Sequence, residues 1–185
     1  MRLLGIAGSV RTGSHNRRLL RAAAAALPDG AALELVDGLA DLPHYSEDLD
    51  REPAPAAVRE LRAAVAAADG LLIATPEYNA SIPGVLKNAL DWLSRPYERH
   101  VLRGKPVAVV GASTGLFGAV WAQAEVRRVL AHVGARVVDR ELPVGQADAA
   151  FAADGGLADP ERASALRALV AALVEEVRAP VAEPA

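Results

Sequence analysis

The sequence predicts an α/β fold in which a parallel β-sheet is covered by α-helices on both faces. Short apolar runs alternate along the chain with stretches of helical periodicity, a pattern typical of parallel strands joined by helical crossovers. Three of the apolar runs are continuous rather than alternating, as in strands that are buried on both faces. Such crossovers are right-handed, which distributes the helices over both sides of the sheet.

Each element can be assigned to a segment of the chain. The expected strands are Arg2–Ala7, Ala32–Asp37, Gly70–Thr75, Pro106–Ala112 and the shortest, Ala135–Asp139. The expected helices are about Asn16–Leu27, Ala56–Ala68, the residues after Pro83, about Gly118–Val133 and the residues after Pro160. Both prolines suit helix starts, because proline is tolerated in the first turn. Residues 1–179 are interpreted as one domain and residues 180–185 as a frayed tail.

The composition excludes several classes of site and partner. The chain is 52% hydrophobic and 23% charged with a net charge of −3, so no nucleic-acid partner is expected. The absence of cysteine excludes disulfides and thiolate sites. The four histidines show no metal-ligand spacing, and we predict no metal site.

Two observations bear on location. The longest apolar stretches are far shorter than the ~20 residues needed to span a bilayer. The N-terminal run MRLLGIAGSV is interrupted by glycines and followed by arginines, which favours a first strand over a signal peptide. We therefore expect a cytoplasmic protein with no membrane partner.

Three loops are the candidate functional segments. Residues 8–14, 75–82 and 111–118 follow predicted strands and are rich in Gly, Ser, Thr, Asn and Pro. In open parallel sheets, ligands bind at the carboxyl ends of the strands, near the switch point in strand order. The three loops should therefore converge on one site.

The first loop has the composition of a phosphate cradle. Ser9, Arg11, Ser14 and Asn16 lie where a strand gives way to a helix; backbone N–H groups, hydroxyls and a guanidinium there favour an anion. The loop lacks Gly-Lys-Ser/Thr and G-x-G-x-x-G, so neither a P-loop nor a dinucleotide motif is present. The set suits a terminal monophosphate. The alternative is a polar turn in which Ser14 or Asn16 caps the helix.

The second loop carries a family resemblance. The segment TPEYNASIPGVLKNALDWL (Thr75–Leu93), together with GSVRTGSHN, resembles the NADPH-dependent FMN reductase family. LPHYSEDL (Leu42–Leu49) and GASTGLFGA also match, and the blocks follow one another in the family's order from about Leu4 to Ala119. Ala119 departs from the pattern, because many relatives carry glycine there.

The resemblance implies a fold, a cofactor and a set of contacts. The fold is a flavodoxin-like three-layer sandwich with a five-stranded parallel sheet in the order 2-1-3-4-5. The cofactor is FMN, with its phosphate held by the four residues of the first loop. The ring is expected to lie along Pro76, Glu77, Tyr78 and Asn79, with donors near its pyrimidine edge from Ser113, Thr114 and Gly115. The alternatives are a half-buried loop aromatic for Tyr78 and a carboxylate pointing to solvent for Glu77.

The third loop also permits a different class of enzyme. Gly111–Gly115 reads G-x-S-x-G between a predicted strand and helix, the context of a hydrolase nucleophile. The only later histidine is His132, within a predicted helix, and Glu125 is the only acid between them. No glycine-rich oxyanion motif lies upstream, so a hydrolase is disfavoured. An FMN-binding electron carrier without substrate chemistry is a second alternative.

We therefore predict an FMN-dependent NAD(P)H oxidoreductase. Hydride would pass from the nicotinamide to flavin N5, and two electrons then to a small-molecule quinone, azo, flavin or metal-oxyanion acceptor. No catalytic acid or base is assigned, because the flavin carries the chemistry. The choice between NADPH and NADH stays open, because no basic cluster for a 2′-phosphate is identified. The resemblance also implies a homodimer or homotetramer.

Overall fold

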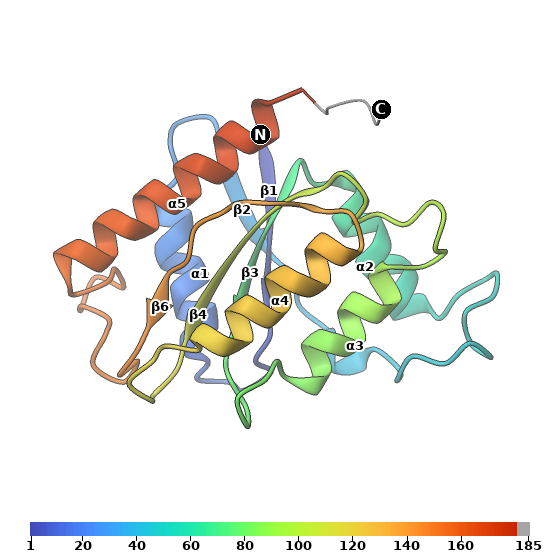
Figure 1. Cartoon of the computed structure of the whole chain (residues 1–185), viewed down its shortest axis with the longest axis horizontal. Helices are drawn as coiled ribbons and strands as arrows, with labels where there is room; N and C mark the ends of the chain where they lie inside the picture. The colour runs from blue at the N-terminus through green and yellow to red at the C-terminus, as the bar shows by residue number, and fades with distance from the viewer. Residues whose placement is uncertain (181–185) are drawn as a thin grey trace.

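The sheet has the predicted strand order. The structure is a computed structural model that describes residues 1–180 (Figure 1). Its strands pair in the order β2-β1-β3-β4-β5, and every pair is parallel. Their bounds are β1 Arg2–Ala7, β2 Ala32–Leu35, β3 Gly70–Thr75, β4 Pro106–Ala112 and β5 Arg136–Val137.

The sheet contains a sixth strand, whereas the sequence predicted five. The fifth strand is only two residues long, and β6 (Pro143–Val144) takes over the same edge of β4 by pairing with Gly111 and Ala112. This segment therefore lies against the carboxyl end of β4, next to the third loop. A two-residue strand is too short to show an alternating apolar pattern, so β6 could not be predicted from the sequence.

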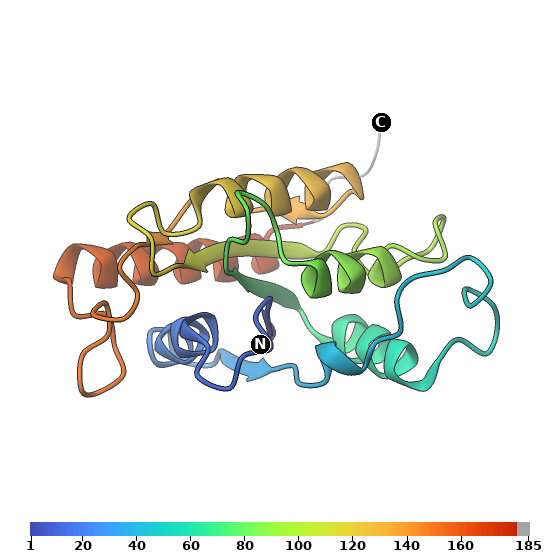
Figure 2. The same ribbon diagram turned by 90° about the horizontal axis from the view of Figure 1, so that it is seen from below.

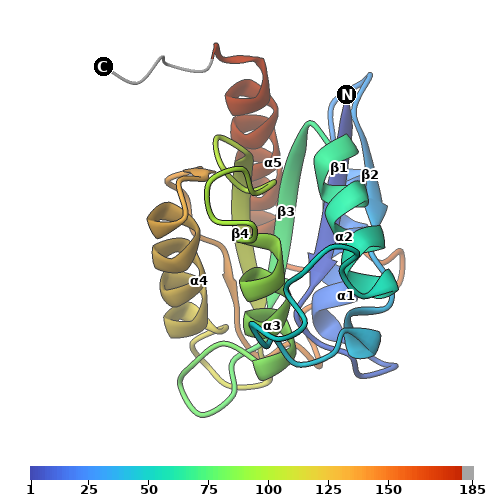
Figure 3. The same ribbon diagram turned by 90° about the vertical axis from the view of Figure 1, so that its right-hand side faces the viewer.

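Within residues 1–180, five α-helices cover the two faces of the sheet, and Figure 3 shows their arrangement. Helices α1 and α5 share one apolar core with the sheet, while α2, α3 and α4 share the other. A short 3₁₀ turn, η1, follows β2. The bounds are α1 His15–Ala25, η1 Leu39–Asp41, α2 Ala56–Ala67, α3 Gly84–Leu93, α4 Val120–His132 and α5 Pro160–Arg178.

Alternation along the buried strands explains their continuous apolar runs. Leu3 of β1 packs in the core with α1 and α5, whereas Leu4 and Ile6 pack in the core with α2 to α4. All three side chains are at most 3% exposed. Since successive side chains of a strand point to opposite faces, both sets must be apolar when both faces are covered.

Two helix starts depend on the prolines noted in the sequence. Pro160 is the first residue of α5, and the side chain of Asp159 before it accepts the N–H of Glu161. Pro83 instead occupies the capping position just before α3.

Two remaining expectations concern the membrane and the tail. Within residues 1–180, no helix combines the length and apolar character needed to cross a membrane. The tail expected at 180–185 lies outside the described residues, apart from Pro180.

Candidate functional site

The three loops converge as predicted on one hollow. It measures about 250 Å³ and lies at the carboxyl ends of β1, β3 and β4, where the strand order switches direction. Eight of the eleven predicted residues line it, and Ser14, Asn79 and Gly115 do not. The lining residues are Ser9, Arg11, His15, Asn16, Pro76, Glu77, Tyr78, Ala112, Ser113 and Thr114.

The β1–α1 loop (residues 8–14) offers donors suited to an anion. The buried Ser14 is the N-cap of α1, where its hydroxyl oxygen accepts the Arg17 N–H. Arg11 is exposed, and one of its guanidinium nitrogens donates to the Gly13 carbonyl at 2.7 Å. Within the described part of the chain, the N–H groups of Thr12 and Gly13 have no acceptor. Free amides beside a helix N-terminus and a guanidinium favour a phosphate.

Asn16 has a structural role at the border of the hollow. Its side-chain amide donates to the Ala112 carbonyl and accepts the Ala112 N–H, both at 2.9 Å. The residue is only 2% exposed. Because both ends of the amide are engaged by β4, Asn16 fixes the start of α1 against the sheet. Its amide nitrogen retains a second N–H at the hollow that the residue lines.

His15 is a lining residue that the sequence did not single out. Its Nε2 lies 3.1 Å from a carboxylate oxygen of Asp148, and its ring stacks on Phe151. Neither ring nitrogen makes a hydrogen bond of good geometry within the described residues. Nothing in a lone histidine after a serine would have revealed this pairing, because Asp148 lies far along the chain.

The second loop contains a tight hairpin. The main chains of Tyr78 and Ser81 exchange hydrogen bonds at 3.0 and 3.1 Å. The two residues between them, Asn79 and Ala80, have φ angles of 54° and 59°. This left-handed pair is the signature of a type I′ turn, in which asparagine is favoured. The turn itself accounts for Asn79, while Tyr78 is 53% exposed at the rim of the hollow.

Glu77 and Ser81 tie this hairpin to α4. A carboxylate oxygen of Glu77 accepts the Ala122 N–H at 3.1 Å, and the Ser81 hydroxyl donates to Glu125 at 2.7 Å. Figure 2 views the molecule from this edge and shows the loop beside the start of α4. The carboxylate of Glu77 therefore binds a helix, contrary to the alternative in which it points to solvent.

The β4–α4 loop (residues 113–119) packs closely on β6. A Cβ added to Gly145 would lie only 2.1 Å from the Leu116 carbonyl oxygen, so this approach requires glycine. Ala119, which departs from the family pattern, keeps a left-handed φ of 63°. The loop therefore retains the conformation that glycine favours, at a cost of roughly 1–2 kcal/mol for a residue with a Cβ.

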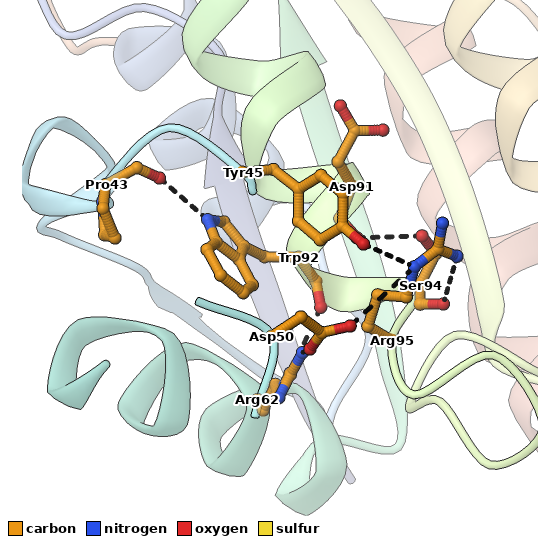
Figure 4. A network of polar contacts seen from close by, with 8 residues as sticks. All are labelled: Pro43, Tyr45, Asp50, Arg62, Asp91, Trp92, Ser94 and Arg95. Carbon is orange, nitrogen blue, oxygen red and sulfur yellow. Dashed lines mark hydrogen bonds and ion pairs between the residues drawn. The ribbon is translucent and has the colours of Figure 1, made fainter. Parts of the chain in front are cut away.

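LPHYSEDL does not line the hollow but is bound to α3 by a network of polar contacts (Figure 4). The indole N–H of Trp92 donates to the Pro43 carbonyl at 2.8 Å, and Arg95 donates to the Tyr45 hydroxyl at 3.0 Å. Just beyond the segment, Asp50 pairs with Arg62 of α2 at 3.2 Å. These contacts give the segment a structural role.

The geometry does not form a hydrolase triad. His132 is the last of the 13 residues of α4, which places it about 18 Å along the helix from the loop at 1.5 Å per residue. The hydroxyl oxygen of Ser113 accepts the Gly115 N–H. Within residues 1–180 no hydrogen bond joins Ser113 to His15, the histidine that shares its hollow. A nucleophile needs a base within hydrogen-bond reach.

A larger hollow lies away from the three loops. It measures about 350 Å³ at the open edge of β2, and its lining includes Glu34, Asp37, Asp41 and Glu60. The one guanidinium in the lining, Arg2, is paired with Glu34 at 2.8 Å, so the remaining carboxylates repel a phosphate. The hollow is also not at the switch point of the sheet. We therefore place the candidate site at the smaller hollow.

A doubly wound α/β sheet, a phosphate-ready first loop and two further loops around one hollow define the class of FMN-binding flavodoxin-like proteins. The sequence profile of the NADPH-dependent FMN reductase family matches residues 1–149. The chain belongs to this family, as its motifs predicted.

Individual relatives agree with this assignment. The chain is 41% identical over 179 residues to an NAD(P)H-dependent FMN reductase of Pseudomonas aeruginosa, with 96% of each chain covered. It is 44% identical over 133 residues to a 2-hydroxy-1,4-benzoquinone reductase of a Burkholderia species, with 72% of each covered. Its fold matches the flavoenzyme NAD(P)H:(acceptor) oxidoreductase FerB of Paracoccus denitrificans with a TM-score of 0.84 and 37% identity, covering 96% of this chain and 97% of that one.

Proposed function

We propose that the protein is an FMN-dependent NAD(P)H oxidoreductase that passes two electrons to a small-molecule acceptor. The observation that carries the proposal is the meeting of three donor-rich loops in one hollow at the switch point of the sheet. Family membership supports it, and so do the reductase names of the relatives. Bound FMN would supply the two-electron hydride chemistry.

The first loop is proposed to hold the FMN phosphate. Arg11 provides the charge, the hydroxyls of Ser9 and Ser14 retain protons to donate, and the amides of Thr12 and Gly13 are free within the described chain. Asn16 fixes the start of α1 through the bonds of its side-chain amide to Ala112, and the second N–H of that amide is proposed to face the phosphate. The donor set fits a doubly charged terminal phosphate.

The other two loops are proposed to flank the flavin ring. Pro76, Glu77 and Tyr78 line the hollow, as do Ser113 and Thr114, and the hairpin that follows stiffens the first group. Donors from the third loop would stabilise negative charge near the pyrimidine edge of the ring. The protein's task is therefore to orient the ring and the two substrates, and to exclude water from them.

The acceptor is proposed to be a quinone, an azo compound, a free flavin or a metal oxyanion. Tyr78, 53% exposed at the rim, offers an aromatic surface for such a molecule. A pure electron carrier would need no small-molecule acceptor, and the relatives named above are reductases. Either NADPH or NADH serves as donor in this proposal. We place the protein in the cytoplasm, where both reduced nicotinamides are available.

Assembly as a homodimer or homotetramer completes the proposal. Leu116, Phe117 and Trp121 are 69%, 59% and 52% exposed beside the hollow, and exposed apolar clusters of this kind mark interaction surfaces. The hollow of about 250 Å³ is also smaller than the roughly 300–1,000 Å³ typical of ligand pockets. A second copy packed on the aromatic residues would deepen it.

The test is a titration of the purified protein with FMN, followed by NAD(P)H oxidation with a quinone. Binding should quench flavin fluorescence and raise the melting temperature, since ligand at about 100 times Kd adds about 2.7 kcal/mol of stability. A protein that shows neither effect at saturating FMN would refute the proposal. Turnover without added flavin after complete removal of FMN would refute the cofactor assignment.

A further inference from the structure

The start of α4 has no cap of its own. Its N-cap residue is Ala119, which has no polar side chain, and the first amides of any helix lack intrahelical acceptors. Glu77 supplies the missing acceptor, because its carboxylate oxygen lies 3.1 Å from the N–H of Ala122, the third residue of the helix. That amide is the one a capping side chain usually binds. A negative charge there is also favoured by the helix dipole.

A second contact binds the same loop to the same helix. The Ser81 hydroxyl donates to Glu125 at 2.7 Å. Glu77 precedes the two-residue turn at Asn79 and Ala80, and Ser81 follows it. The hairpin is therefore held to α4 on both sides of its turn.

The same helix also supports the loop on the opposite side of the hollow. Gln123 is fully buried, and its amide nitrogen donates to the carbonyls of Gly118 and Ala119 at 3.1 and 3.4 Å. These two residues end the β4–α4 loop. The first two turns of α4 thus hold both loops between which a flat ring would lie.

We propose that Glu77 is a positioning residue that sets the slot for the flavin ring by capping α4, rather than by binding the ligand with its carboxylate. The proposal rests on the proposed function, because the ring is the occupant of that slot. Loss of the cap would leave the hairpin held to α4 only through Ser81 and Glu125, which would loosen it and weaken the binding of any ligand that uses the ring. It would leave the contribution of the phosphate loop unchanged.

Three substitutions of Glu77 distinguish the effect of its hydrogen bond to Ala122 from the effect of its charge. Glu77→Gln keeps an oxygen that can accept the Ala122 N–H but removes the charge. Glu77→Asp keeps the charge but is one methylene too short for the contact, and Glu77→Ala removes both. Glu60→Ala, at an exposed glutamate of α2, is the matched control.

The readout is the affinity for FMN and for riboflavin. Glu77→Ala and Glu77→Asp should weaken both ligands by the same factor, about tenfold, which corresponds to ~1.4 kcal/mol and to one hydrogen bond. The ratio of the two affinities should not change. Glu77→Gln should stay within about threefold of the wild type, in keeping with the modest energy of the dipole contact, and Glu60→Ala should match the wild type.

Several results would overturn the proposal. Unchanged flavin affinity in Glu77→Asp would show that the contact does not position the ring. Full affinity in Glu77→Asp combined with weak binding in Glu77→Gln would assign the role to charge. A changed ratio of FMN to riboflavin affinity would place the effect on the phosphate.

Hydrogen exchange in the flavin-free protein tests the cap independently of the proposed function. The Ala122 amide should lose protection in Glu77→Asp and keep it in Glu77→Gln. Equal protection in both variants would refute the cap. A wild-type protein that binds neither flavin would refute the proposed function and the ring-positioning role, while exchange at Ala122 would still decide whether Glu77 caps α4.

Discussion

Replacing Arg11 with alanine is expected to weaken FMN binding steeply while barely changing riboflavin binding. Arg11 is the only guanidinium of the β1–α1 loop, and one of its nitrogens is held by the Gly13 carbonyl at 2.7 Å. That bond orients the group without using all its donors. Riboflavin has no phosphate, so it gains nothing from the arginine.

The magnitude follows from the number of charged hydrogen bonds that are lost. One bond to a charged group contributes about 1.5–3 kcal/mol, which is about 10- to 150-fold in affinity at 1.4 kcal/mol per decade. Arg11 is exposed, so salt screens the interaction and the lower part of the range applies at physiological ionic strength. We expect a loss of about tenfold to thirtyfold for FMN, larger at low salt.

Calorimetric titration of both flavins against both proteins measures the effect. Arg59→Ala, which removes the same charge from an exposed position of α2, is the control and should leave both affinities unchanged. Equal losses of FMN and riboflavin affinity in Arg11→Ala would mean that the arginine supports the fold or the ring. The phosphate assignment for this loop would then be wrong.

Four other changes have defined outcomes. Ala80→Gly should stabilise the protein by about 0.5–1 kcal/mol in urea unfolding, because relief of a left-handed alanine (about 1–2 kcal/mol) outweighs the greater freedom of unfolded glycine (about 0.4–1); a destabilised variant would contradict the type I′ turn. Ser113→Ala should show no loss of esterase activity, because the wild type should have none; a nitrophenyl ester hydrolysed by the wild type alone would revive the hydrolase. Burial, reinforced by Arg103 and then Arg95, lowers the pKa of the His100 imidazole below its usual 6.5. The free energy of unfolding should therefore fall as the pH drops below about 6.5, where only the unfolded chain takes up the proton. The wild type and His100→Gln should diverge in unfolding free energy between pH 7.5 and 5.5, and parallel curves would refute this. Trp121→Glu should shift the protein to a smaller species in sedimentation velocity, whereas an unchanged sedimentation coefficient would remove the aromatic cluster from the interface.

The strands and helices could be predicted because their patterns are long and local. Arg2–Ala7, Gly70–Thr75 and Pro106–Ala112 were predicted with the bounds that the structure gives them, because a continuous apolar run of strand length is a strong local signal. The strand expected at Ala135–Asp139 is only two residues long in the structure, and β6, which follows it, was not predicted. Both depend on contacts with β4 rather than on their own sequence.

In the site, too, some features could be predicted from the local sequence and others depend on distant contacts. Convergence of the loops followed from the rule for carboxyl ends of parallel strands. The tasks of Asn16 and Glu77 did not, because each makes its bond to a partner 96 or 45 residues away. From the sequence, a polar residue in such a loop is equally suited to bind a ligand or to hold the scaffold. Only the atoms that such a residue contacts distinguish a ligand-binding role from a structural one, and those contacts form only when the chain folds.

The central claim is tested most directly by anaerobic reduction of the FMN-loaded protein. NADPH or NADH, added in one equivalent, should bleach the visible absorbance of the bound flavin, and a quinone added afterwards should restore it. Comparison of the two donors also decides which nicotinamide is preferred. A protein that binds FMN but is bleached by neither donor would contradict the account and favour an electron carrier.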